Sequence, residues 1–132
     1  PMRVKILLCE DNLLNQEIAA TVLRKRNYLV ETALNGQLGV EKFKASAIGE
    51  FGAILMDLRM PVLDGYGAAK AIRRLPRADA GSVPIIALSA DAYDENIQQA
   101  KEAGMNAHLS KPLEVKKLFL LLEEWLNQSQ GS

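Results

Sequence analysis

Short apolar runs alternate with longer amphipathic runs along the whole chain. The short runs predict five strands, at residues 4–9, 29–33, 53–56, 84–88 and 107–110. Several of these runs are apolar without alternation, which is typical of strands that are covered on both faces. The pattern therefore predicts a sheet that is buried between two layers.

Apolar residues between these runs recur at helical spacing and predict five helices. One helix, at residues 37–47, is weaker because Gly39 costs about 1 kcal/mol relative to alanine inside a helix. Asp64 is placed to cap a helix that begins near Gly65, and Gly104 is placed to end one. The other four helices are marked by apolar stripes, whose members are Leu14, Ile18, Ala19, Val22 and Leu23; Ala68, Ala69 and Ile72; Ile97, Ala100 and Ala103; and Val115, Leu118, Phe119, Leu122 and Leu126.

Five strand–helix units with short connections predict an α/β domain, an open parallel sheet with helices on both faces and right-handed connections. The 132 residues fit one domain, spanning residues 1–132 with a core at about 4–126. Pro1 before Met2 and the small polar tail at 128–132 are interpreted as the edges of a piece cut from a longer protein. In such a sheet, ligands bind beyond the carboxyl ends of the strands, near a switch in strand order.

The composition excludes several classes of function. Sixteen basic and sixteen acidic residues give zero net charge, so the broad positive field of a nucleic-acid-binding protein is not expected, although a local patch is still open. No apolar run approaches the roughly 20 residues that span a bilayer, and no signal peptide opens the chain. Cys9 is the only cysteine and is interpreted as a small core residue, so a reducing cytoplasm is the expected compartment.

Charged and hydroxyl residues follow four of the five predicted strands. Glu10 and Asp11 end the first strand, Asp57 the third, Ser89 the fourth and Lys111 the fifth. In a parallel sheet these residues meet at one edge. Three carboxylates that lie together repel one another unless a cation compensates them, and Mg²⁺ prefers carboxylates, water and phosphate oxygens.

The remaining groups at this edge suit a phosphoryl ligand. Lys111 supplies a compact positive charge and Ser89 a neutral hydroxyl donor. Phosphoryl transfer depends mainly on in-line positioning and charge neutralisation. The sequence therefore predicts a metal-assisted phosphoryl site with Asp57 as the nucleophile.

The runs LLCEDN, MDLRMPVLDG, ALSA and LSKP resemble the receiver domains of two-component response regulators and hybrid histidine kinases. The resemblance covers residues 4 to about 126, and EDNLLNQ and AGMNAHLSKPL are most similar to receivers attached to hybrid kinases. It implies a flavodoxin-like, doubly wound fold, with a five-stranded parallel sheet in the order 2-1-3-4-5 flanked by five helices. It also implies a signalling switch that turns over no external metabolite, either alone or as the cytoplasmic part of a membrane-bound hybrid kinase.

The resemblance assigns the phosphoacceptor and the metal ligands. It implies that Asp57 is phosphorylated by a histidine kinase or a histidine phosphotransfer protein. Asp11 and Asp57 would bind Mg²⁺ directly, together with the backbone carbonyl of Arg59, while Glu10 would act largely through water. Mn²⁺ is an alternative ion.

The resemblance also assigns the switch. Ser89 would move toward the phosphoryl group, Lys111 would contact it, and the peptide between Lys111 and Pro112 is expected to be cis. The fourth helix, fifth strand and fifth helix would bind a downstream effector or a dimer partner. Leu120 and Leu121 fall outside the apolar stripe of the last helix and are either part of that partner surface or scattered surface leucines.

Three positions are expected to modulate the switch. His108 replaces the tyrosine or phenylalanine common three residues before the lysine in this family. It is either a surface histidine on an edge strand or a weaker, pH-sensitive link between site and surface. Arg59 and Asp91 lie where receivers control the access of water to the phosphoryl group. They either form a pair across the mouth of the site or are independent side chains.

Three other functions compete with this interpretation. A phosphatase of the haloacid-dehalogenase type would need an aspartate where Arg59 stands. A flavodoxin-like cofactor binder would need a phosphate loop free of acids where Glu10, Asp11 and Asn12 stand. A pseudo-receiver that binds without phosphorylation is disfavoured by the intact site but is kept open by His108.

Overall fold

The computed structural model describes residues 3–90 and 94–130, and in these ranges strands alternate with helices. The strands are β1 (Lys5–Cys9), β2 (Leu29–Ala33), β3 (Phe51–Asp57), β4 (Ile85–Ser89) and β5 (Ala107–Ser110). The helices are α1 (Leu13–Lys25), α2 (Gly36–Ala45), α3 (Gly65–Arg73), α4 (Asp94–Glu102) and α5 (Val115–Gln130). Every predicted element is present, although β3 begins two residues earlier and α2 ends two residues earlier than predicted.

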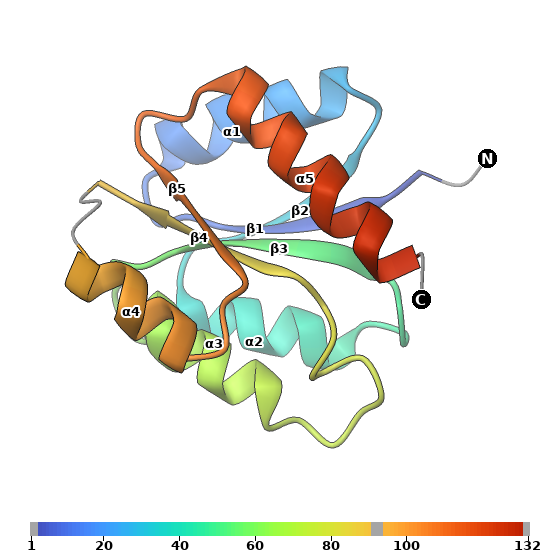
Figure 1. Ribbon diagram of the computed structural model, residues 1–132, viewed down its shortest axis with the longest axis vertical. Helices are drawn as coiled ribbons and strands as arrows, with labels where there is room; N and C mark the ends of the chain where they lie inside the picture. The colour runs from blue at the N-terminus through green and yellow to red at the C-terminus, as the bar shows by residue number, and fades with distance from the viewer. Residues whose placement is uncertain (1–2, 91–93, 131–132) are drawn as a thin grey trace.

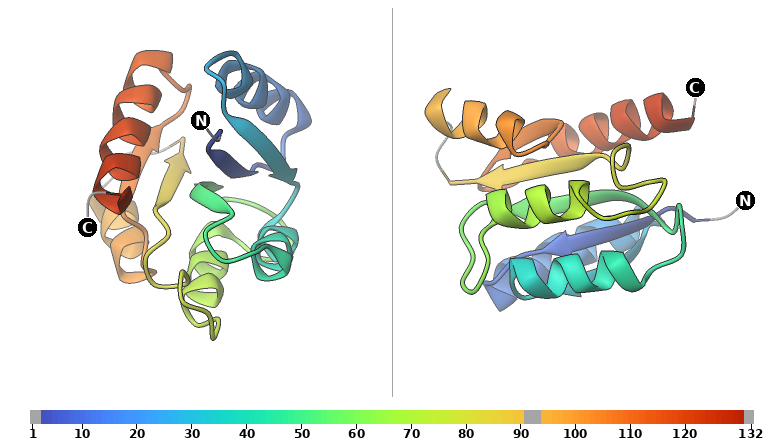
Figure 2. Two further views of the ribbon diagram at one scale, coloured as in Figure 1. Left: turned by 90° about the vertical axis from the view of Figure 1, so that its right-hand side faces the viewer. Right: turned by 90° about the horizontal axis from the view of Figure 1, so that it is seen from below.

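The five strands form one parallel sheet in the order β2-β1-β3-β4-β5. Helices α1 and α5 cover one face of the sheet, and α2, α3 and α4 cover the other (Figures 1 and 2). The predicted fold class and strand order are therefore confirmed. Because all strands are parallel, their carboxyl ends lie at one edge, where the candidate residues are expected.

The core consists of one apolar cluster on each face of the sheet. In β1, Leu7 and Cys9 belong to the cluster beneath α2 and α3, whereas Ile6 and Leu8 belong to the cluster beneath α1 and α5. All four are fully buried. Burial on both faces explains why the strand runs show no alternation.

The predicted apolar stripe of α1 is partly wrong. Leu14 and Ile18 are 68% and 56% exposed, while the buried residues of α1 are Gln16, Ala19, Ala20 and Leu23. The two alanines are small, so they let the helix lie close to the sheet, and the larger side chains are left at the flank. An apolar surface consequently remains open on α1.

The stripe of α5 also differs from its prediction. Leu118, Phe119, Leu122 and Leu126 are buried as predicted, but Val115, the first residue of the helix, is half-exposed. Leu120 points outward with 59% exposure, as predicted. Leu121 was predicted to be exposed beside it, yet it is half-buried against the core because the packed face of α5 is wider than the stripe.

Two glycines permit close packing around the site. A Cβ atom at Gly39 would lie 2.6 Å from Cys9 Sγ, so this glycine weakens α2 but allows it to approach β1. A Cβ atom at Gly65 would lie 2.3 Å from the carbonyl oxygen of Asp57. The predicted cap of α3 is confirmed, since Asp64 Oδ1 accepts a 2.8 Å hydrogen bond from the amide of Gly67.

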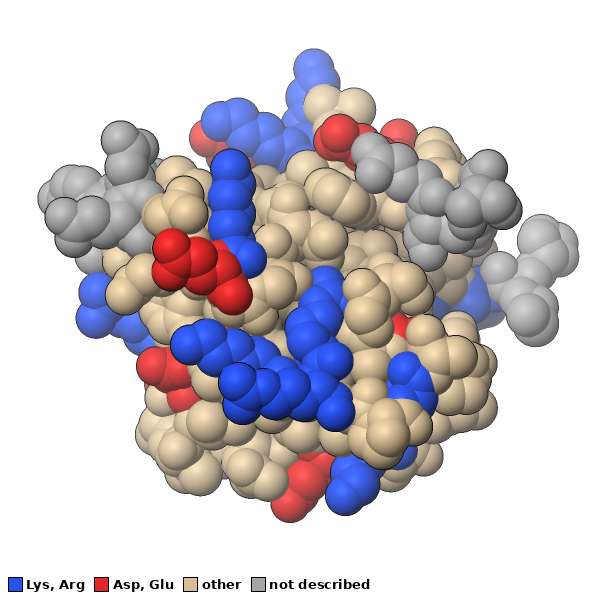
Figure 3. Space-filling view, turned by 60° about the horizontal axis from the view of Figure 1, so that its bottom comes forward, with Lys and Arg blue, Asp and Glu red and all other residues tan. Residues whose placement is uncertain are grey.

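Lysine and arginine side chains gather on the side of the molecule that α2, α3 and α4 cover (Figure 3). The last turns of these helices contain Lys42, Lys44, Lys70, Arg73 and Lys101. Cations are favoured there by the negative end of the helix dipole. Acidic side chains lie among them in Figure 3, so this is a local and mixed patch rather than a broad positive surface.

None of the described helices combines the length and apolarity needed to cross a bilayer.

Candidate functional site

Asp57 is the last residue of β3, in the middle of the sheet, and is only 5% exposed. The chain after it is fixed by two backbone hydrogen bonds, from Leu58 N–H to Leu88 O and from Gly65 N–H to Leu58 O, each 3.0 Å long. Asp57 Oδ1 accepts a 3.1 Å hydrogen bond from the amide of Arg59. The carboxylate is therefore held in one orientation at the carboxyl edge.

Glu10 and Asp11 follow β1 directly and meet Asp57 at this edge. One carboxylate oxygen from each of the three residues lies within 4.8 Å of the others. Glu10 and Asp57 are buried and Asp11 is exposed, so the cluster is open to solvent on one side. Clustered hard oxygen ligands of this kind suit a divalent cation such as Mg²⁺.

Lys111 bridges the two buried carboxylates. Its Nζ lies 2.6 Å from Glu10 Oε1 and 2.8 Å from Asp57 Oδ2. The Lys111 amide donates a 2.8 Å hydrogen bond to Ser89 O, which ties β5 to the end of β4. The peptide between Lys111 and Pro112 is cis, as expected. A positive charge thus offsets part of the repulsion within the acidic cluster.

The surroundings shift the pKa values of Glu10 and Lys111. Burial, followed by a hydrogen bond with Asp57, raises the pKa of Glu10 from 4.5 to about 7, against the opposing effect of Lys111. For Lys111, burial alone would lower the pKa, but hydrogen bonds and attraction from Asp57 and Glu10 together raise it. At neutral pH and without a cation, the site therefore retains a proton on part of the Glu10 carboxylates, whereas Lys111 stays charged.

The loop between β1 and α1 is fixed by side chains. The side-chain oxygen of Asn12 caps α1 by accepting a 2.9 Å hydrogen bond from Asn15 N–H. The backbone N–H of Asn12 donates to Glu10 Oε2 at 3.3 Å. Gln16 Nε2 donates to two main-chain carbonyls, Glu10 O at 3.1 Å and Ala33 O at 3.4 Å. Both acids of this loop are thus attached to a firmly anchored backbone.

Gln16 was not among the site residues predicted from the sequence. It is one of four buried polar or charged residues among the described side chains, and the other three are site residues. A signal for it exists, because Gln16, Ala19, Ala20 and Leu23 occupy positions i, i+3, i+4 and i+7 of one helical face. A glutamine on an otherwise apolar buried face indicates a polar group that it must satisfy.

Ser89 ends β4 at the same edge and is 5% exposed. It therefore lies at the predicted edge of the sheet, while its role in the site and its movement on phosphorylation stay predictions. Arg59 is exposed beside the acidic cluster. Asp91 lies outside the described residues, so its pairing with Arg59 also stays a prediction.

His108 is half-buried on β5, with its Nε2 atom enclosed and without a hydrogen-bond partner among the described residues. Burial lowers the pKa of its imidazole. Its place on the edge strand β5 is as predicted, and its link between site and surface stays a prediction. The ring is turned partly inward, and in the described part of the chain no polar group bonds to its enclosed nitrogen.

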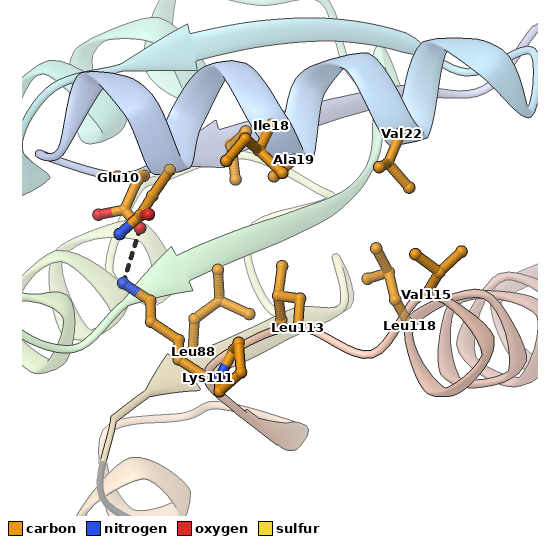
Figure 4. Close-up of a pocket in the computed structure, with 12 residues that line it drawn as sticks. Glu10, Ile18, Ala19, Val22, Leu88, Lys111, Leu113, Val115 and Leu118 are labelled. Carbon is orange, nitrogen blue, oxygen red and sulfur yellow. Dashed lines mark hydrogen bonds and ion pairs between the residues drawn. The ribbon is translucent and has the colours of Figure 1, made fainter.

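An apolar pocket of about 430 Å³ adjoins the acidic site (Figure 4). Glu10 and Lys111 lie at one end of it. One wall comes from α1, with Ile18, Ala19 and Val22. The opposite wall comes from the loop before α5 and the start of α5, with Leu113, Val115 and Leu118. The exposed side chains of Leu13, Leu14 and Ile18 therefore form an apolar surface on α1 close to the site.

Comparison with known protein families agrees with this geometry. The family described as the response regulator receiver domain matches residues 6–123. This chain is a receiver domain. Receiver domains are signalling switches of phosphorelay systems, so the phosphatase and flavodoxin-like alternatives are set aside.

Curated relatives of this receiver domain include two hybrid or sensor kinases. The chain is 47% identical over 120 residues to hybrid signal transduction histidine kinase M of Dictyostelium discoideum, covering 90% of this chain and 5% of that protein. It is 42% identical over 132 residues to the osmosensing histidine protein kinase SLN1 of Saccharomyces cerevisiae, covering 97% of this chain and 10% of that protein. The receiver domain therefore spans a small part of the length of these relatives.

Solved structures are similar over nearly the whole chain. The receiver domain of sensor histidine kinase PA1611 from Pseudomonas aeruginosa has a TM-score of 0.86 and 37% identity, covers 96% of this chain and 99% of that one, and holds a magnesium ion in its active site cleft. The co-crystal structure of the yeast phosphotransfer protein Ypd1 and the Ssk1 receiver domain has a TM-score of 0.83 and 34% identity, with coverage of 96% and 92%. The fold agrees in both structures.

Proposed function

We propose that this receiver domain accepts a phosphoryl group on Asp57 in a Mg²⁺-dependent reaction. The observation that carries the proposal is the cluster of Glu10, Asp11 and Asp57, whose oxygen atoms lie within 4.8 Å and whose buried members share Lys111. Three acids and one base leave an excess of negative charge at a partly buried edge. A divalent cation and a phosphoryl group together complement such a site.

The donor set fits Mg²⁺. Asp11 and Asp57 would bind the ion directly, together with the backbone carbonyl of Arg59, and Mn²⁺ is the alternative ion. Glu10, which pairs with Lys111 at 2.6 Å, would act largely through water. When bound, the ion supplies positive charge that stabilises the developing charge on the phosphoryl oxygens.

In the reaction, a carboxylate oxygen of Asp57 attacks the phosphorus of a phosphohistidine in line with the leaving nitrogen. A phosphorus–oxygen bond forms as the phosphorus–nitrogen bond breaks, and the departing imidazole keeps the electron pair. Lys111 exchanges its contact with Asp57 Oδ2 for one with a phosphoryl oxygen. Ser89 then donates its hydroxyl hydrogen to the group, which carries a charge of about −1.5 to −2.

The phosphodonor is a histidine kinase or a histidine phosphotransfer protein. Its histidine must reach a carboxylate that is 5% exposed, so the partner has to cover the mouth of the site. The exposed residues Leu13, Leu14 and Ile18 and the pocket in Figure 4 lie beside that mouth and offer apolar area for docking. The structural similarity to a receiver solved together with Ypd1 supports a partner of this kind.

Phosphorylation biases a two-state equilibrium of α4, β5 and α5, the surface that binds a downstream effector or a second copy. Leu120 is an exposed apolar residue of this surface. Water later hydrolyses the aspartyl phosphate, and Arg59 together with Asp91 limits its access. The domain thus catalyses its own phosphorylation and the later removal of the phosphoryl group, in the cytoplasm. The role of His108 in coupling the site to the surface stays a prediction.

Intact-mass analysis tests the proposal. After incubation with acetyl phosphate and Mg²⁺, the chain is expected to gain one phosphoryl group, and Asp57→Ala is expected to gain none. Asp64→Asn is the matched control, since it removes a neighbouring acid but keeps a cap for α3. An unmodified wild-type chain, or a phosphorylated Asp57→Ala variant, contradicts the proposal and favours a pseudo-receiver or another acceptor.

A further inference from the structure

Gln16 is a buried polar side chain whose surroundings on α1 are apolar. It is 8% exposed and lies on the face of α1 formed by Ala19, Ala20 and Leu23. An apolar residue would bury more hydrocarbon there, and a buried amide is unfavourable unless it is hydrogen-bonded. The choice of glutamine is therefore explained by what its amide group binds.

The amide of Gln16 joins the carboxyl ends of two strands. It donates to Glu10 O, immediately after β1, and to Ala33 O, the last residue of β2. Glu10 N–H also donates to Ala33 O at 3.0 Å. The backbone of Glu10 is thus fixed at its N–H by β2 and at its carbonyl by α1.

The Glu10 carbonyl belongs to the peptide group that leads into Asp11. Because a peptide group is planar, holding that oxygen also fixes the nitrogen of Asp11 and the direction in which its Cα leaves the sheet. Asp11 is exposed, and among the described residues its side chain has no hydrogen bond or ion pair that would hold it near Glu10 and Asp57. Repulsion among three carboxylates acts to move Asp11 outward.

We infer that Gln16 is a positioning residue, which keeps Asp11 within reach of Glu10 and Asp57 by holding the peptide between Glu10 and Asp11. The inference rests on the proposed Mg²⁺ site and deepens it. Gln16 itself contacts neither the ion nor the phosphoryl group. Its effect is to reduce the rearrangement that the loop must undergo when a cation binds.

The test compares Gln16→Met with Gln37→Met, and the probe is Mg²⁺ alone. Methionine keeps the length of the side chain and removes the amide donor. Gln37 is exposed in the first turn of α2 and bonds only Glu41, at 3.4 Å, among the described residues. Titration calorimetry gives the Mg²⁺ dissociation constant of each chain, and urea unfolding in a chelator gives its stability without the ion.

Gln16→Met is expected to bind Mg²⁺ about tenfold more weakly than wild type, the size typical for residues that orient metal ligands. Gln37→Met is expected to bind like wild type. The amide resonances of Asp11 and Asn12 are expected to shift in Gln16→Met while those of α3 and α5 stay in place. If Gln16→Met does not fold, Gln16→Leu serves in its place, because leucine suits the apolar face of Ala19, Ala20 and Leu23.

Equal Mg²⁺ affinity in wild type and the Gln16 variants overturns the inference. It is also overturned if amide shifts spread through the domain and the loss of affinity follows the loss of stability, since Gln16 would then be an ordinary structural residue. A wild-type chain that does not bind Mg²⁺ at all is a different result, because it contradicts the proposed function itself.

Discussion

Glu10 belongs to the proposed cation site, and it also lowers the stability of the folded domain when no cation is bound. It is 3% exposed, its carboxylate lies beside that of Asp57, and Lys111 compensates only part of the charge. Burial and the neighbouring acid raise its pKa to about 7. A buried acid that resists ionisation is unfavourable for folding at neutral pH, and a bound cation would reverse this effect.

The raised pKa of Glu10 predicts a pH dependence of stability. The folded pKa, about 7, lies above the ordinary value of 4.5, so the folded chain binds this proton more tightly than the unfolded chain. The contribution of Glu10 to stability is therefore full below pH 4.5 and is lost as the pH rises through about 7. In a chelator, the free energy of unfolding of wild type minus that of Glu10→Gln is expected to fall across this range.

Urea unfolding of both chains at several pH values measures this difference. The subtraction cancels His108, whose lowered pKa acts in the opposite direction, so that its contribution to stability rises with pH up to about 6.5. A difference that is constant or increases with pH would show that Glu10 is not held protonated in the folded domain.

At the scale of elements, Arg73 connects the end of α3 to the loop before β4 and to the loop before β5. It is the last residue of α3, and its guanidinium donates to Gly104 O at 3.0 Å, Ala80 O at 3.0 Å and Asn106 Oδ1 at 2.8 Å. Asn106 Oδ1 also accepts a 2.8 Å bond from Ile85 N–H. Arg73 thus joins the end of α3 to the loops before β4 and β5.

Replacing Arg73 by alanine is expected to destabilise the domain by about 2 kcal/mol. The change removes three hydrogen bonds that a charged guanidinium donates, and the three acceptor oxygens lose this donor. Arg74→Ala is the matched control, since Arg74 is an exposed neighbour and is expected to change stability by less than about 0.5 kcal/mol. Urea unfolding at neutral pH measures both values. Equal effects of the two variants would mean that the bonds of Arg73 contribute nothing net.

Elements were predictable from periodicity, but the faces that they bury were less so. The existence of all ten elements and the cap at Asp64 follow from local pattern and cap chemistry. The exposure of Leu14 and Ile18 does not, because it depends on how closely Ala19 and Ala20 let α1 approach the sheet. Leu121 was misplaced for a related reason, since its burial depends on the width of the contact between α5 and the core.

The candidate site was predictable in its members and less so in its contacts. Parallel strands bring their carboxyl ends to one edge, so Glu10, Asp11, Asp57, Ser89 and Lys111 were expected together, and the structure places them there. The two hydrogen bonds from Lys111 Nζ, to Glu10 and to Asp57, were not expected, nor was the role of Gln16 in the loop. The contacts of Lys111 depend on packing between distant segments, which no local pattern encodes. Gln16 has a local signal, its place on the buried face of α1, but the carbonyl groups that it binds are not evident from that pattern.

At the scale of the whole molecule, the fold brings mutually repelling carboxylates together at one edge of the sheet. Two apolar clusters stabilise the two faces of the sheet, while the carboxyl edge carries three acids, one base and an apolar pocket beside them. The stable layers thus fix the positions of groups that would not cluster by themselves. The same edge is where the chain would receive its phosphoryl group and its donor.

Reduction with borohydride after treatment with acetyl phosphate tests the central claim most directly. Borohydride converts an aspartyl phosphate to homoserine, which peptide mapping by mass spectrometry then locates in the chain. The account predicts homoserine at position 57 when Mg²⁺ is present and none when a chelator replaces it. Homoserine at position 11 or 64, or equal labelling of Asp57 with and without Mg²⁺, would contradict it.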